Sequence, residues 1–196
     1  EGLGSIYWHM VSKLLLAIGE NISILANKET DKSAINRLIS HYQQIKKGIG
    51  ASKSPVVYGS FPIDPYSHTP SMSGVQQPGM TGQVKEDIIS RFMELGVSVE
   101  NGQIHFTPLF LNKNEFVCQT DNDTHPHPFL SFSYCGIPIT YLADDGKGIE
   151  IVDMSCQTTQ ISSYALTTEQ SRAVFYRESG IKQVIVHLPD QKIPER

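Results

Sequence analysis

Several features that would assign a protein to a class at once are missing from this chain of 196 residues. Its three cysteines, Cys118, Cys135 and Cys156, are an odd number without CxxC spacing, which argues against a disulfide framework or a cysteine zinc site. The longest apolar run, Leu14 to Ile18, is too short to span a bilayer, and no signal-peptide pattern opens the chain. A net charge of -4 gives no attraction to nucleic acid or anionic membranes. We expect a cytoplasmic protein with reduced thiols that binds neither nucleic acid nor membranes.

Known nucleophile and nucleotide motifs are also missing. The chain has no Gly-x-Ser-x-Gly elbow, no P-loop and no dinucleotide fingerprint. His125 and His127 are spaced like a metal pair, but no further ligand residues cluster near them in the sequence. An exposed loop is the better interpretation there, and we expect no metal and no cofactor.

The first half of the chain has helical periodicity. We expect a buried helix over residues 6–20 that Gly19 ends, and a second from an Asp31 cap to Gly48. A third is expected from Val84 to Leu95, with Gly96 as its stop and with an apolar face formed by Ile88, Ile89, Phe92 and Met93. Because the first helix is apolar on nearly all sides and starts abruptly, we expect the chain to be the C-terminal piece of a larger protein and its first fifty residues to self-associate.

From Val97 the period changes to that of β-strands, which predicts an α+β fold. Expected strands cover residues 97–99, 103–107, 115–118, 130–135, 137–142, 149–152 and 183–188. Asn101-Gly102, Cys135-Gly136 and Asp145-Gly146 are turn signals between them, typical of an antiparallel sheet system. One helix interrupts the strands, opened by the capping box Thr167-Thr-Glu-Gln and closed by Gly180.

The most informative segment is the Pro/Gly/Ser-rich loop from Lys53 to Thr81, which holds five of the eleven prolines. A loop of that length inside a compact domain is usually functional or disordered, and its aromatic residues argue against disorder. It ends in Gly79-Met-Thr-Gly82 at a helix start, where free N–H groups and the helix dipole favour an anion. We therefore interpret it as a loop that builds a site.

Each candidate site residue has a plain structural alternative. Thr81 and Gly82 suit phosphate binding, or simply a helix cap and a tight turn. Asp64, with Tyr66 and His68, suits substrate hydrogen bonding or acid–base work, although an Asp before a Pro commonly closes a turn. His9, a lone histidine beside aromatic residues, is more often a core residue with a satisfied hydrogen bond. Trp8 is either a core residue or a surface that packs against a sugar.

In order along the chain, the segments of residues 4 to about 110 resemble the C-terminal part of glycoside phosphorylases of the cellobiose phosphorylase type, and large bacterial proteins related to them. Four short motifs carry the resemblance: Gly4-Ser-Ile-Tyr-Trp-His9, Asp64-Pro-Tyr66, the pair Thr81-Gly82 with Leu95-Gly-Val97, and Asn101-Gly-Gln-Ile-His-Phe-Thr-Pro108.

The resemblance implies that residues 1–95 are the last helices of an (α/α)6 barrel, with a site-building loop at 52–82. Residues 96–196 would then be an antiparallel, β-sandwich-like C-terminal domain. His9 and Thr81-Gly82 match positions that bind inorganic phosphate in that family. The family's phosphate-binding Gln after the Pro-Tyr segment is replaced here by Ser67-His-Thr-Pro70, and Gln77 or Gln76 could compensate. The family's catalytic carboxylic acid lies upstream of this sequence.

These observations predict a fragment of a carbohydrate-active enzyme that acts on glycosidic bonds by phosphorolysis or hydrolysis. Its partners would be a carbohydrate and the missing N-terminal part of the parent protein, with inorganic phosphate as the co-substrate of a phosphorolysis. The fragment alone would be inactive because the general acid is absent. The alternative is a non-catalytic module that binds carbohydrate or docks against a neighbouring domain.

Overall fold

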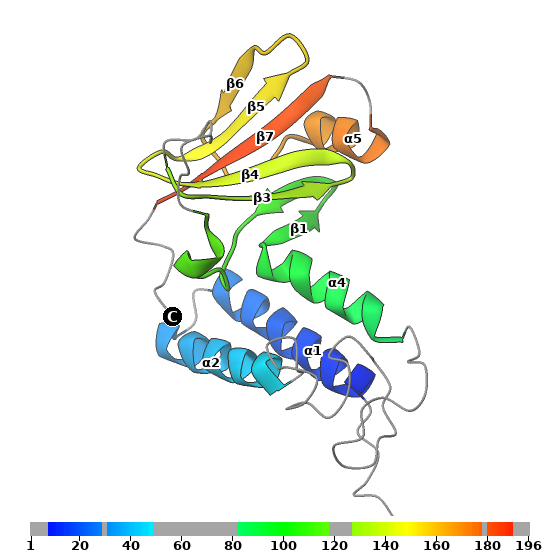
Figure 1. Ribbon diagram of the computed structural model, residues 1–196, viewed down its shortest axis with the longest axis vertical. Coiled ribbons are helices and arrows are strands. Elements are labelled where there is room, and N and C mark those ends of the chain that lie inside the picture. The colour runs from blue at the N-terminus through cyan, green and yellow to red at the C-terminus, as the bar shows by residue number, and fades with distance from the viewer. Residues whose placement is uncertain (1–7, 29–30, 49–81, 118–126, 178–179, 190–196) are drawn as a thin grey trace, which may run out of the picture. The chain divides into compact units, whose positions relative to one another are not determined.

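The structure is a computed structural model that describes residues 8–28, 31–48, 82–117, 127–177 and 180–189. The chain divides into two compact units, Glu1–Met93 and Glu94–Arg196, which are described separately below. Within the described residues the fold is α+β, as the sequence predicts, with the helices of the first unit followed by two sheets and one further helix (Figure 1).

The first unit contains three described helices, α1 (Trp8–Asn27), α2 (Lys32–Gly48) and α4 (Gly82–Glu94). Asp31 caps α2 as expected, since its Oδ1 accepts a hydrogen bond of 2.8 Å from the Ser33 amide. The buried side chains of α1 and α2 form the core of this unit: Leu15, Ile22, Ile39 and Tyr42.

Gly19 does not end the first helix, contrary to the sequence prediction. The helix continues for two more turns to Asn27, and Gly19 lies at a close approach between α1 and its neighbours. A Cβ atom at Gly19 would stand 2.0 Å from Met93 Cε and 3.3 Å from Tyr42 Cε2. The absence of a side chain therefore makes room for α4 and α2. Ile88 and Ile89, predicted on the apolar face of α4, are about half exposed, at 52% and 50%.

Helix α4 ends before Gly96, whose φ of +72° suits a glycine. The first strand of the second unit, β1 (Val97–Glu100), follows. It pairs with β2 (Gln103–Phe106) through Asn101 and Gly102, both with positive φ, as a type I′ turn requires. The turn predicted at Cys135-Gly136 has the same geometry and joins β3 (Phe129–Tyr134) to β4 (Ile137–Ala143). The segment predicted as a strand over 115–118 is instead a 3-10 turn at Lys113–Glu115 with one bridge from Val117 to Phe129.

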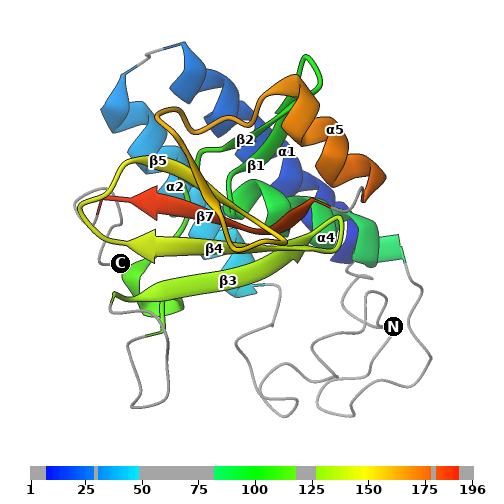
Figure 2. The same cartoon turned by 90° about the horizontal axis from the view of Figure 1, so that it is seen from above.

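The larger sheet has the strand order β3-β4-β7-β5-β6, with β5 at Gly148–Asp153, β6 at Thr158–Ile161 and β7 at Ile181–Leu188 (Figure 2). The prediction of a purely antiparallel sheet is wrong, because β7 runs parallel to β4. It lies between β4 and β5, so the Asp145-Gly146 signal joins two strands that do not pair. Strand β6 was not predicted from the sequence; it is an edge strand whose residues are mostly exposed.

Helix α5 (Thr168–Tyr176) packs against β2 and opens with the predicted capping box. The Thr167 hydroxyl accepts from the Gln170 amide at 3.2 Å, and the Gln170 side chain accepts from the Thr167 amide at 2.9 Å. The sequence predicts that this helix ends at Gly180, but it ends earlier, at Arg177, which has the left-handed conformation. A hydrogen bond of 2.9 Å from the Ile104 amide to the buried Ser171 hydroxyl fastens α5 to β2.

Tyr141 lies at the centre of the second unit's core. It is fully buried on β4, makes edge-to-face contacts with Phe106 and Phe132, and donates its phenolic hydrogen to the Leu95 carbonyl. Burial raises the pKa of this phenol far above its ordinary value of 10. The phenol is therefore a neutral donor that ties β4 to the start of the unit.

Candidate functional site

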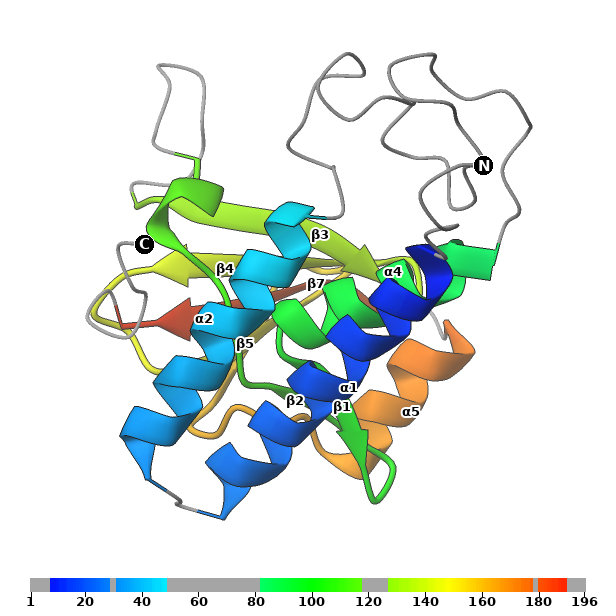
Figure 3. The same ribbon diagram turned by 90° about the horizontal axis from the view of Figure 1, so that it is seen from below.

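The first candidate site is the common N-terminal end of α1 and α4. Ser12, in the second turn of α1, is buried and donates a hydrogen bond of 3.2 Å to Asp87 Oδ1, in the second turn of α4. A second contact lies about two turns further along both helices, where Gly19 of α1 lies against Met93 of α4. Because both contacts advance along the two helices together, α1 and α4 run parallel, whereas α2 runs opposite to α1 (Figure 3).

This arrangement places two predicted anion-binding positions at the same end of the first unit. His9 lies three residues before Ser12, and Gly82 five residues before Asp87. At a rise of ~1.5 Å per residue, the two backbone positions lie ~4.5 Å and ~7.5 Å from the level of the Ser12–Asp87 contact. Gly82 is also the first residue of α4, so its amide is among the free N–H groups at the positive end of that helix.

The other predicted site residues are not placed. Trp8 and His9 belong to the first turn of α1, but their side chains lie outside the described part of the structure, and so do these five residues: Thr81, Gln77, Asp64, Tyr66 and His68. The structure thus places the backbone positions of His9 and Gly82 at the same end of the α1–α4 pair. The side-chain roles remain predictions.

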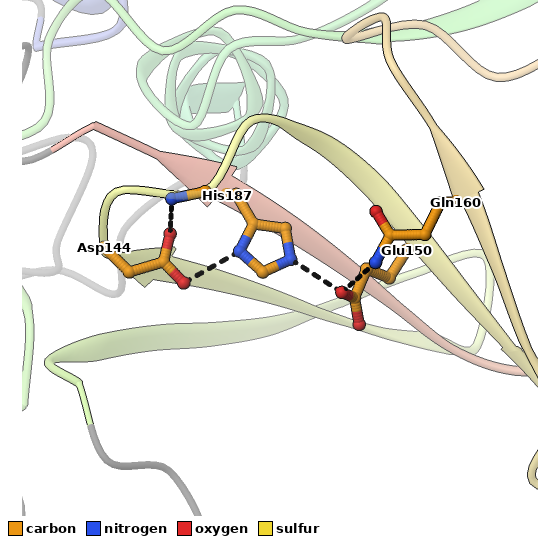
Figure 4. Close-up of polar contacts among 5 residues, drawn as sticks. Asp144, Glu150, Gln160 and His187 are labelled. Carbon is orange, nitrogen blue, oxygen red and sulfur yellow. Dashed lines mark hydrogen bonds and ion pairs between the residues drawn. The ribbon is translucent and has the colours of Figure 1, made fainter.

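The second candidate is a cluster of polar side chains around His187 on β7 (Figure 4). Residues 144–147 form an arch that carries the chain from the end of β4 over β7 to the start of β5. Asp144, at the foot of the arch, lies with Oδ2 2.8 Å from His187 Nδ1 and accepts from the Gly146 amide at 2.9 Å through Oδ1. Glu150 Oε1 lies 3.2 Å from His187 Nε2 and also accepts from the Gln160 amide group.

This cluster is well packed and little exposed. The side chains of His187, Asp144 and Glu150 are 13%, 12% and 23% exposed. A Cβ at Gly146 would stand 2.6 Å from His187 Nδ1, so only glycine lets the arch approach the ring this closely. His187 Nε2 lies close enough to Glu150 for an ion pair, but the two groups are not aligned for a hydrogen bond.

The geometry around His187 favours a structural role over catalysis. A general base needs one ring nitrogen that faces a substrate or nucleophile, and here both ring nitrogens face carboxylates. The cluster instead fastens the arch and β5 to β7. The cluster was not predicted from the sequence, because Asp144 and His187 are 43 residues apart and only the insertion of β7 between β4 and β5 brings them together.

The second unit also contains an apolar groove and an exposed cysteine. A groove of about 220 Å³ is lined by apolar and aromatic side chains without a carboxylate or imidazole: Phe106, Thr107, Pro108, Leu109, Leu111, Tyr164 and Leu188. Cys156, exposed and free, accepts a hydrogen bond of 3.2 Å from Lys182 Nζ. Neither feature contains a carboxylate or an imidazole.

Across the described ranges, no three His, Cys, Asp or Glu side chains are grouped so that they could hold a metal ion. His127 is described and exposed, and His125 lies outside the described residues. No described helix is both long and apolar enough to cross a membrane. Comparison with protein-family models and with curated proteins gave no match to this chain.

Proposed function

We propose that this chain is part of a carbohydrate-active enzyme that acts on glycosidic bonds, in which the first unit supplies one end of a helical barrel. That end would bind inorganic phosphate, or the anionic group of another ligand, next to the sugar. The parent enzyme's general acid would come from another part of the polypeptide. The proposal combines the resemblance of residues 4–110 to glycoside phosphorylases with the geometry of α1 and α4.

The observation that carries the proposal is the parallel packing of α1 and α4 with α2 antiparallel to α1. In an (α/α)6 barrel the inner helices run parallel to one another and alternate along the chain with antiparallel outer helices. The Ser12–Asp87 contact between the parallel helices α1 and α4 supports assigning them as two neighbouring inner helices of such a barrel. Their N-termini then face one end of the barrel, where the dipoles of both helices would favour an anion.

The proposed roles follow from this end-on arrangement. The Gly82 amide would donate to a phosphate oxygen, the Thr81 hydroxyl would add a second donor, and His9 would approach from α1. Asp64, Tyr66 and His68 would contact the sugar, and Trp8 would pack beneath it. Gln77 would replace the phosphate-binding glutamine of the related enzymes.

The test is an NMR titration of the full chain with inorganic phosphate, alone and with a β-linked disaccharide. We expect the largest shifts at the Gly82 amide and the His9 ring, and weaker binding in the Thr81→Ala and His9→Ala variants. His41→Ala is a matched control, because His41 is exposed on α2 and far along the chain from either helix start.

Three results would contradict the proposal: phosphate shifts confined to other residues, no shifts at millimolar phosphate, or equal effects of His9→Ala and His41→Ala. The alternative of a non-catalytic carbohydrate module predicts a different pattern. In that case the disaccharide alone would bind, and phosphate would not change its affinity.

A further inference from the structure

Helix α1 has a second apolar face that the other described helices of the first unit, α2 and α4, leave uncovered. Its buried side consists of Ser12, Leu15, Gly19 and Ile22, which face α2 and α4. On the opposite side three large apolar side chains are more than half exposed, Met10 at 56%, Leu14 at 53% and Ile24 at 51%. Isolated exposed apolar residues are common, but these three belong to one continuous stripe.

The spacing of the stripe is that of a coiled-coil seam. We define the α1 stripe as the exposed residues that follow one another at intervals of four, three, four and three: Met10, Leu14, Ala17, Asn21 and Ile24. Such alternation places Leu14 and Asn21 at a positions and Met10, Ala17 and Ile24 at d positions of a heptad. A seam of this kind packs against another helix with the same spacing.

The charges beside the stripe select an antiparallel partner with the same sequence. Lys13 and Glu20 are both exposed and both occupy g positions on one flank. In an antiparallel pair the g positions of the two helices face each other. When Leu14 lies opposite Ala17 of a second copy, Lys13 faces the other copy's Glu20, and the twofold axis repeats this pair.

The other flank fits the same arrangement. The half-buried e positions are Val11, Ile18 and Leu25, and in this register Val11 faces Ile18 of the second copy. A parallel pair would instead place the Lys13 ammonium against Ile18 and the Glu20 carboxylate against Leu25, which leaves both charges unpaired. Charge complementarity therefore favours the antiparallel pair.

We propose that the α1 stripe is a self-association surface, on which a second copy of this chain packs its own α1 antiparallel with reciprocal Lys13–Glu20 ion pairs. This inference does not depend on the proposed carbohydrate activity. It rests on exposure and charge along one described helix. Ala17 near the twofold axis lets the two backbones approach closely, and the larger apolar side chains surround it.

The experiment is sedimentation equilibrium of the full chain and its charge variants, from micromolar to about millimolar concentration. We expect a monomer–dimer equilibrium for the unchanged chain. Lys13→Glu and Glu20→Lys each replace two attractive contacts with two repulsive ones and should weaken the dimer about tenfold. The double variant Lys13→Glu/Glu20→Lys restores opposite charges in both pairs and should recover the original affinity.

Two controls keep the result interpretable. Lys47→Glu changes an exposed charge on α2, away from the stripe, and should leave the affinity unchanged. Circular dichroism of each variant checks that the helices still form. A chain that stays monomeric throughout, or a double variant no tighter than the single ones, would overturn the proposal, and so would a dimer equally weakened by Lys47→Glu.

Discussion

Gly148 is a residue at which the backbone leaves little freedom of substitution. Its φ is +86°, and a Cβ there would stand 2.0 Å from the Ile161 carbonyl oxygen on the neighbouring strand β6. Gly136 has almost the same φ, +84°, but its nearest neighbour would be the Arg177 Nε atom at 3.9 Å. A substitution at Gly136 therefore introduces backbone strain alone, whereas the same substitution at Gly148 adds a steric clash with the main chain.

We expect Gly136→Ala to lower the free energy of unfolding of the second unit by about 1–2 kcal/mol, the cost of a left-handed non-glycine residue. Gly148→Ala should cost about 3 kcal/mol or more, because the clash with a carbonyl adds to the same strain. Urea denaturation followed by circular dichroism measures both. Equal losses in the two variants would show that the close approach of β6 to Gly148 does not constrain the fold.

Tyr141 makes the stability of the second unit depend on pH in the alkaline range. Burial raises the pKa of this phenol above its ordinary value of 10, so the folded chain keeps the proton that the unfolded chain loses. The stabilisation is complete below pH 10 and decreases as the pH rises above it. Burial, and to a smaller extent the charge of Cys135, also raise the pKa of Tyr134.

We expect Tyr141→Phe to cost about 1–2 kcal/mol at pH 7, because the Leu95 carbonyl loses its buried donor. Above pH 10 the difference between the two proteins should shrink by about 1.4 kcal/mol per pH unit. Urea denaturation at a series of pH values measures it. A difference that stays constant from pH 7 to pH 11 would contradict the role given to this phenol.

At the scale of elements, the arch over β7 depends on one carboxylate. Asp144 accepts from the Gly146 amide and lies beside His187, whereas the next residue, Asp145, is exposed. We expect Asp144→Ala to lower the free energy of unfolding by about 2 kcal/mol, since two part-buried partners, the Gly146 amide and the His187 ring, lose their acceptor. Asp145→Ala should change it by less than about 0.5 kcal/mol.

Hydrogen exchange distinguishes a local effect from a global one. In Asp144→Ala the Gly146 amide should exchange faster than in the unchanged chain, while the amides of β1 and β2 keep their protection. If both aspartate variants lose the same stability, the ion pair with His187 contributes nothing measurable.

Elements defined by local signals were predictable from the sequence, and those defined by distant contacts were not. The capping box of Thr167 and Gln170 and the Asn101-Gly102 turn depend on neighbouring residues, so their patterns were sufficient. Gly19 gave the wrong helix end because its packing against Met93, far along the chain, overrides its tendency to stop a helix. The mostly exposed residues of β6 carry no apolar alternation that would have indicated a strand.

The candidate site divides in the same way. The start of a helix at Gly82 could be predicted from the Thr-Gly pair and the periodicity after it. The parallel arrangement of α1 and α4 could not, because the Ser12–Asp87 hydrogen bond joins residues 75 positions apart. The cluster of Asp144, Glu150 and His187 could not be predicted either, because Asp144 and His187 are also far apart in the sequence.

At the scale of the whole molecule, the proposed function predicts what the chain does not do by itself. Glycoside cleavage needs a carboxylic acid within hydrogen-bond reach of the leaving oxygen. The enzymes that residues 4–110 resemble have theirs upstream of the segments that resemble this chain. We expect the purified chain to show no phosphorolysis or hydrolysis of β-linked disaccharides, measured by release of reducing sugar or sugar phosphate. Turnover that disappears in Asp64→Asn would show instead that Asp64 is the acid.

The position of β7 also determines when the second unit can fold. β4 and β5 follow each other along the chain, yet both pair with β7, which begins 28 residues after β5 ends at Asp153. Until Ile181–Leu188 has left the ribosome, the described strands of the larger sheet can form only two separate hairpins, β3–β4 and β5–β6. Isolated hairpins are marginally stable in water, so co-translational folding of this unit should be late and nearly all-or-none.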